Sequence, residues 1–143
     1  MDWTHLFFSF DGRISRKPYW IASCIVIVAS VLILVLFNQP DERRLGSVLD
    51  LALLYPDYAV VFKRAHDRDM QMWIPTLSLI LSVLMTIVGI LGLDGPFDSP
   101  TPLYLAIALP NLAVAFYLIA DLGFRRGTRG PNRYGADPLE GRT

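Results

Sequence analysis

The sequence predicts an all-α, polytopic membrane protein with four transmembrane helices, an interfacial N-terminal segment and both termini in the cytoplasm. Three observations predict it. The chain has 53% hydrophobic and only 18% charged residues, whereas soluble domains carry about 25% charged residues. Four apolar stretches, at about 19–37, 45–62, 73–93 and 102–120, are long enough to cross a bilayer as helices. Basic residues collect in alternate segments between these stretches.

The placement of Lys and Arg predicts the orientation. Arg43 and Arg44 are the only basic residues of the first connector, where they follow Asp41 and Glu42, and the third connector has no Lys or Arg. Because cytoplasmic loops are enriched in Lys and Arg, the other three segments are expected on the cytoplasmic side. Residues 1–143 are then a single membrane domain with a cytoplasmic tail at 121–143. The basic residues of the three segments are Arg13, Arg16 and Lys17; Lys63, Arg64 and Arg68; and Arg125, Arg126, Arg129, Arg133 and Arg142.

The N-terminal segment is too short to cross the membrane. Residues 3–10 are rich in aromatic side chains, which suits a segment lying flat among the lipid headgroups. Gly12 permits a sharp change of direction, and Ser15 can cap the helix that follows.

The first span has no charged residue between Ile21 and Phe37, and Tyr19 and Trp20 supply interfacial aromatics before it. A signal peptide is the alternative, since basic residues precede the stretch. However, residues 36–40 offer no cleavage site of small residues, so we expect an uncleaved anchor.

The second span is the least regular because it contains Asp50, Pro56 and Asp57. A charged Asp at the centre of a span costs about 2.5–3.5 kcal/mol. Without this span, however, basic segments would fall on opposite sides of the membrane. Asp50 and Asp57 lie two helical turns apart and share one face, which is expected to avoid lipid. These carboxylates suggest a transport hypothesis, because intramembrane acids can relay protons or bind cations. Alternatively, both lie near the ends of the span and are solvated or paired there.

The third and fourth spans carry stripes of small residues at helical spacing, and the connector between them is acidic and rich in turn-forming residues. Small residues allow helices to approach closely inside a membrane, so both stripes predict helix–helix contacts. The stripes are Ser78, Ser82, Thr86 and Gly89 in the third span, and Ala106, Pro110, Ala113 and Ala120 in the fourth.

Three polar motifs flank the spans, at Phe10–Trp20, Arg64–Asp67 and Gly127–Pro138. Together they resemble the patterns Phe-x-Gly-Arg-x-x-Arg-x-x-Tyr-Trp, Arg-x-His-Asp and Gly-x-x-Gly-x-Asn-Arg-[Tyr/Phe]-Gly-x-Asp-Pro of the bacterial inner-membrane family known as domain of unknown function 805. The resemblance covers nearly the whole chain. It implies a multi-pass protein of the bacterial inner membrane, and it implies no reaction because the family has no established activity.

The predicted topology brings a set of motif residues to the cytoplasmic face. In one hypothesis Asp67 pairs with an Arg from the N-terminal segment or the tail and locks the inner end of the bundle. In another, Arg13, Arg16, Arg64 and Arg133 bind an anionic lipid headgroup or a phosphorylated ligand. The set comprises Arg13, Arg16, Arg64, His66, Asp67, Asn132, Arg133 and Tyr134.

We expect no enzyme, cofactor or metal site. His66 and Asp67 are adjacent and lack a placed nucleophile, and with Asp69 they lack the spacing of an established metal site. Cys24 is the only cysteine. The expected partners are membrane lipids, a second copy of the chain or another membrane protein, and not nucleic acid. The sequence thus predicts a non-enzymatic inner-membrane protein, and the alternative is a small ion- or proton-coupled transporter that uses Asp50 and Asp57.

Overall fold

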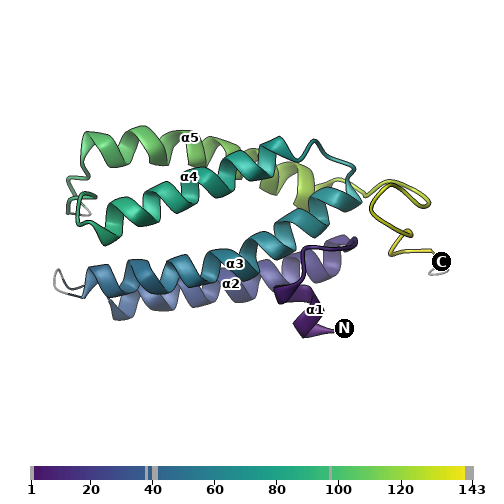
Figure 1. The fold of residues 1–143 in the computed structure, drawn as a ribbon, viewed down its shortest axis with the longest axis horizontal. Helices are drawn as coiled ribbons and strands as arrows, with labels where there is room; N and C mark the ends of the chain where they lie inside the picture. The colour runs from purple at the N-terminus through teal and green to yellow at the C-terminus, as the bar shows by residue number, and fades with distance from the viewer. Residues whose placement is uncertain (1, 38, 40–41, 97, 141–143) are drawn as a thin grey trace.

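The structure is a computed structural model that describes residues 2–37, 39, 42–96 and 98–140. Helices make up its regular elements, and the described residues form no strand (Figure 1). The elements are α1 (Trp3–Phe8), α2 (Arg16–Leu36), α3 (Arg43–Asp67), α4 (Trp73–Ile90), α5 (Pro102–Leu118) and the π-helical η1 (Ile119–Phe124).

Four helical segments are long and apolar enough to cross a membrane, which confirms the predicted fold class. They are Arg16–Leu36, Arg43–Asp67, Trp73–Ile90 and Pro102–Phe124. Thr101 begins the last of these, because its hydroxyl accepts a hydrogen bond from the Tyr104 N–H and Pro102 occupies the first turn.

The long helices lie side by side in chain order (Figure 1). Helix α3 packs against α2 and α4, and α4 packs against α5. The last span contacts the first two spans at one end of the bundle, where η1 packs against α2 and α3. Helix α1 packs against α3 near this end, and the tail extends from the same end. The N-terminal segment, the α3–α4 connector and the tail therefore meet, and we call this the basic end.

Two helices extend further than the apolar stretches. Helix α3 continues past the predicted limit at residue 62 to Asp67, so the second polar motif is helical. Helix α5 continues through η1 to Phe124, so the tail begins after Phe124 and not at 121. In both cases the polar side chains of the added turns have partners on other elements, which apolar periodicity does not reveal.

Of the two predicted stripes of small residues, one makes contacts with a neighbouring helix and the other does not. On α4, Ser78 and Ser82 bond to Tyr58 of α3, and Gly89 lies against Ser47 of α3. The contacts predicted for α4 are therefore present. The prediction for the fourth span is wrong within this chain, because its four stripe residues are exposed. The side of α5 that faces α4 instead carries Asn111, whose amide bonds to Ser82.

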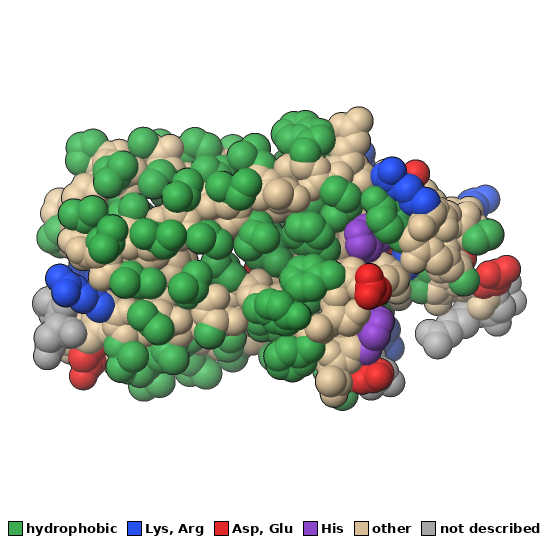
Figure 2. Space-filling model, viewed as in Figure 1, with side chains coloured by type: hydrophobic (Ala, Val, Ile, Leu, Met, Phe, Trp, Pro, Cys, Tyr) green, Lys and Arg blue, Asp and Glu red, His purple; other side chains and the backbone are tan. Residues whose placement is uncertain are grey.

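On the face shown in Figure 2, the surface of the bundle is apolar along its length, and charged side chains gather at the two ends. Exposed side chains such as Ile27, Ile80 and Leu109 lie on the middle of the helices. Such a large exposed apolar surface is unfavourable in water and suits contact with lipid.

Candidate functional site

A buried carboxylate, Asp67, lies at the centre of the basic end, in the last turn of α3. Its Oδ1 accepts hydrogen bonds from Nε and Nη2 of Arg13, at 3.1 and 3.0 Å. Its Oδ2 accepts from Nη1 of Arg64, one turn earlier on the same helix. The three side chains are between 1% and 3% exposed, so one carboxylate and two guanidinium groups share a site with little solvent.

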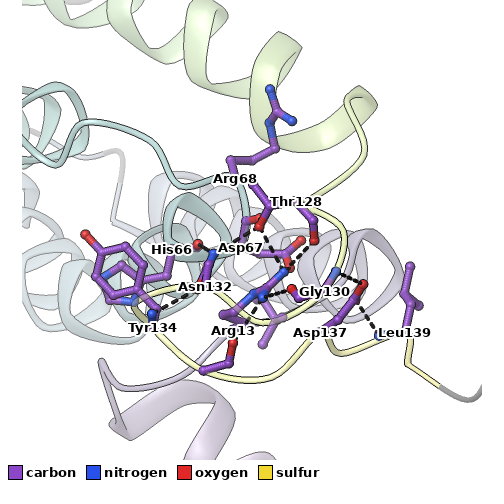
Figure 3. A network of polar contacts seen from close by, with 12 residues as sticks. Arg13, His66, Asp67, Arg68, Thr128, Gly130, Asn132, Tyr134, Asp137 and Leu139 are labelled. Atoms are coloured by element: carbon purple, nitrogen blue, oxygen red, sulfur yellow. Dashed lines mark hydrogen bonds and ion pairs between the residues drawn. The ribbon is translucent and has the colours of Figure 1, made fainter.

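The remaining donors of Arg13 bind the tail (Figure 3). Nη1 donates to the carbonyl oxygens of Gly130 at 2.8 Å and Gly135 at 3.1 Å. Nη2 donates to the carbonyl oxygen of Thr128 at 2.8 Å. One side chain from the N-terminal segment therefore joins the end of α3 to three points of the tail.

Arg64 joins α3 to the end of the last span. Its Nε donates to the carbonyl of Leu122 in η1 at 2.7 Å, and its Nη2 donates to the carbonyl of Arg125 at 2.5 Å. The π-helical turn brings these carbonyls over α3. Because backbone carbonyls carry partial negative charge, they stabilise the positive charge that Asp67 alone does not balance.

The tail approaches Asp67 closely at two residues. The Thr128 N–H donates to the Asp67 carbonyl at 2.8 Å. At Gly127, a Cβ atom would collide with the Asp67 carboxylate, so only glycine fits there. At Gly130 the backbone has φ +74°, which allows the turn that directs its carbonyl toward Arg13.

A second layer of contacts covers the buried pair. Asn132 donates from its amide to the carbonyl of His66 at 2.9 Å. The rings of His66 and Tyr134 stack with centroids 3.8 Å apart, and Arg133 lies over the outer face of Tyr134 at 4.8 Å. Arg133 also pairs with Asp69 at 2.8 Å, where both side chains are exposed. These residues hold the tail against α3.

Arg16 lines a small cavity with Arg64 and Asp67 but makes no hydrogen bond to the other described members of the predicted cluster. It is exposed, and its Nη1 donates to the carbonyl of Phe124 at 3.2 Å. The structure therefore brings the other predicted residues into one network around Asp67, whereas Arg16 contacts the end of η1 separately.

Sequence reasoning missed a second carboxylate at this end. Asp121 of η1 is buried and accepts from Arg68 at 3.0 Å and from Arg125 at 2.9 Å. It also missed Lys63, whose buried ammonium donates to the carbonyls of His5 and Leu6 and so fixes α1. The basic partners of Asp121 were visible in the sequence only as part of a charge pattern, although an acid at the end of an apolar stretch was a usable signal.

Asp137 closes the turn of the tail. Its Oδ1 accepts from the Leu139 N–H at 2.9 Å and its Oδ2 from the Gly130 N–H at 3.1 Å. The bond from Leu139 contributes most to lowering the pKa of the Asp137 carboxyl below its usual value, and the bond from Gly130 and the charges of Arg13 and Arg126 lower it further.

The polar groups of the cluster are engaged mainly by one another and by backbone carbonyls. Nδ1 of His66 lies 3.2 Å from the carbonyl of Gly12, and no hydroxyl or thiol of the described residues bonds to the ring. Asp67 is occupied by two guanidinium groups. Among the described residues there is no group of three or more His, Cys, Asp or Glu side chains that could hold a metal ion.

The intramembrane carboxylates are not brought together. Asp50 lines a cavity of about 430 Å³ at the other end of the bundle, together with Arg43, Asp94 and Tyr104. Its Oδ1 is buried and has no hydrogen-bond partner among the described residues. Asp57 does not line this cavity.

The fold and the site define a class: four-span helical membrane proteins with one polar end held together by buried Arg–Asp contacts. Within that class, the chain belongs to the family described as "Protein of unknown function (DUF805)", whose model matches residues 7–136. The resemblance given by the three motifs is thereby confirmed.

Two relatives from Escherichia coli (strain K12) extend along most of the chain. The uncharacterized protein YiiR is 32% identical over 91% of this chain and 86% of its own length. The inner membrane protein YhaH is 26% identical over 96% of this chain and 97% of its own length. No solved structure matches the chain. With its four apolar helices, the chain is a multi-pass inner-membrane protein of unknown function.

Proposed function

We propose that this is a non-enzymatic inner-membrane protein whose basic end faces the cytoplasm and is locked by the Arg13–Asp67–Arg64 cluster. The lock holds the N-terminal segment, the end of α3 and the tail in one arrangement. It thereby presents a fixed surface, which includes Arg133 and Tyr134, to a partner protein in the cytoplasm.

The observation that carries the proposal is the set of contacts made by Arg13. Its side chain is 1% exposed, and its guanidinium divides its donors between Asp67 and the tail carbonyls. A buried arginine with all of its donors engaged is poorly placed to bind a soluble ligand. It is well placed to join segments that are distant in sequence.

The test is to remove Arg13 and compare the loss with that of an exposed arginine. After Arg13→Ala, Asp67 keeps its pair with Arg64 but loses both bonds from Arg13, and three tail carbonyls lose their donor. A buried hydrogen bond to a charged group contributes about 1.5–3 kcal/mol, whereas an exposed ion pair contributes about 0–1 kcal/mol. Arg13→Ala should therefore lower the melting temperature in detergent strongly and increase amide hydrogen exchange in residues 128–137. Arg133→Ala, which removes the exposed pair with Asp69 and the contact with the Tyr134 ring, is the matched control.

Asp67→Asn should reproduce the effect of Arg13→Ala, because an amide keeps the shape of the side chain but loses its charge. Combining Arg13→Ala with Asp67→Asn should cost less than the two single changes added together. If Arg13→Ala leaves both melting and tail exchange equal to those of Arg133→Ala, the lock is wrong.

Ion- or proton-coupled transport is the second candidate, and the unpartnered oxygen of Asp50 in its cavity supports it. Proteoliposomes with a pH-sensitive dye inside test it. Coupled proton entry by the wild type that Asp50→Asn abolishes would favour transport, with Asp57→Asn showing whether the second carboxylate takes part. A wild type no faster than empty liposomes would remove this candidate.

A further inference from the structure

A second cavity lies at the basic end, beside the lock. It measures about 530 Å³ and is bounded by α1, the start of α2 and the end of the described tail. Its apolar wall is formed by Leu6, Ile14, Pro18, Ile21 and Leu139. The N-terminal part of the chain and the tail, which are distant in sequence, thus form a space lined by both apolar and polar side chains.

The polar residues that line the cavity include a lysine whose ammonium group has no partner among the described residues. Lys17 lines the cavity and is exposed, and it makes no hydrogen bond or ion pair with any of the described residues. Ser15 also lines it, and its side chain makes no capping bond to α2. Arg13 reaches the cavity as well, but its donors are engaged by Asp67 and the tail. Of the Lys and Arg residues that line the cavity, Lys17 is therefore the one whose charge is available to a ligand.

Asp2 is the only carboxylate among the described residues that line this cavity, and its charge is partly engaged. Its Oδ1 accepts a hydrogen bond from the His5 N–H at 3.1 Å, at the start of α1. The lining therefore favours an anion next to Lys17.

An apolar row leads away from the cavity along α2. Ile21, at the edge of the cavity, is followed at intervals of one turn by Ile25, Val28 and Leu32, and all four are exposed. A ligand in the cavity therefore has continuous access to the lipid-facing side of a membrane-spanning helix. A free phosphate would contact only the polar residues of the cavity, whereas a phospholipid would contact these residues and also the apolar row along α2.

We propose that this cavity binds the headgroup of an anionic phospholipid from the leaflet at the basic end. Lys17 binds the phosphate, the glycerol region lies against Pro18 and Ile21, and an acyl chain follows the row along α2. The proposal goes beyond the lock, and it can be tested apart from it because Lys17 makes none of the contacts of the lock.

The experiment compares lipid retention by the full-length wild type and two variants. Each protein is equilibrated with mixed micelles that contain phosphatidylglycerol and phosphatidylethanolamine at equal concentration, and native mass spectrometry counts the retained lipids. Lys17→Ala should lower the phosphatidylglycerol-to-phosphatidylethanolamine ratio about fivefold, the factor for one lysine at a membrane surface. Arg129→Ala, which removes an exposed base of the tail outside the cavity, should leave the ratio unchanged.

Two further arms complete the test. Lys17→Arg should retain the wild-type ratio, and glycerol 3-phosphate in excess should not displace phosphatidylglycerol. Equal ratios for wild type and Lys17→Ala would overturn the site, and displacement by glycerol 3-phosphate would overturn the lipid in favour of a soluble anion. The tail exchange that tests the lock should be normal in Lys17→Ala, so the two proposals can fail separately.

Discussion

At Asp67, one negative charge meets two positive charges in a site with little water. Arg13 and Arg64 donate to separate oxygens of the carboxylate. Their other donors bind backbone carbonyls of the tail and of η1. Burial of an ion pair is favourable only when the remaining donors are also satisfied. The tail carbonyls are thus part of the ionic site, and the tail cannot leave without exposing the donors of Arg13.

Asp137 gives the tail a dependence on pH. The fold lowers the pKa of this carboxyl, chiefly through the Leu139 N–H. Its contribution to tail stability is therefore complete above the pKa of an unfolded aspartate, about 3.9. The contribution is lost as the pH falls through the lower, folded value. We expect the extra protection of amides 128–139 in wild type over Asp137→Ala to be present at pH 7 and to disappear under strong acid.

Hydrogen exchange measured by mass spectrometry and corrected for the intrinsic rate at each pH checks this prediction. Arg129→Ala serves as the control for a tail substitution that leaves the carboxylate in place. A difference between wild type and Asp137→Ala that persisted unchanged down to pH 2 would mean that the ionised carboxyl does not stabilise the turn.

At the scale of the helices, the sequence predicted which segments meet but not how they contact each other. The positive-inside pattern and the four apolar stretches predicted that three polar motifs lie at one end, and the structure places them together. Local patterns did not distinguish Arg13 from Arg16. Arg13 precedes α2 and its side chain is buried, whereas Arg16 lies in the first turn of α2 and is exposed. That difference depends on packing of the chain entering α2, beside the buried Ile14.

The last span shows why the second carboxylate of the basic end escaped prediction. Apolar periodicity follows the helix up to about residue 120, and Asp121 reads as the start of a polar tail. The π-helical turn extends the helix to Phe124 and directs Asp121 toward Arg68. Such a turn changes the direction of side chains by local hydrogen bonding. A count of apolar residues contains no information about it.

At the scale of the whole molecule, the two ends differ in how their charges are used. At the basic end, buried acids pair with arginines from other segments. At the other end, Arg43 and Asp94 approach to 4.0 Å with both side chains partly exposed. Exposed pairs contribute little to stability. Ion pairs therefore hold the helices together mainly at the basic end. At the opposite end the helices are joined less tightly by charge, and the cavity beside Asp50 lies there.

The orientation of the molecule in the membrane is the last prediction. Because Lys and Arg are retained on the cytoplasmic side during insertion, we expect the basic end inside and residue 99 outside. Single cysteines replace Ser99 or Glu140, both exposed, in a Cys24→Ser background. A membrane-impermeant maleimide added to spheroplasts should label Ser99→Cys at once. It should label Glu140→Cys only after the membrane is permeabilised. The background without cysteine controls for non-specific labelling, and the reverse pattern would place the lock outside the cell while leaving its contacts intact.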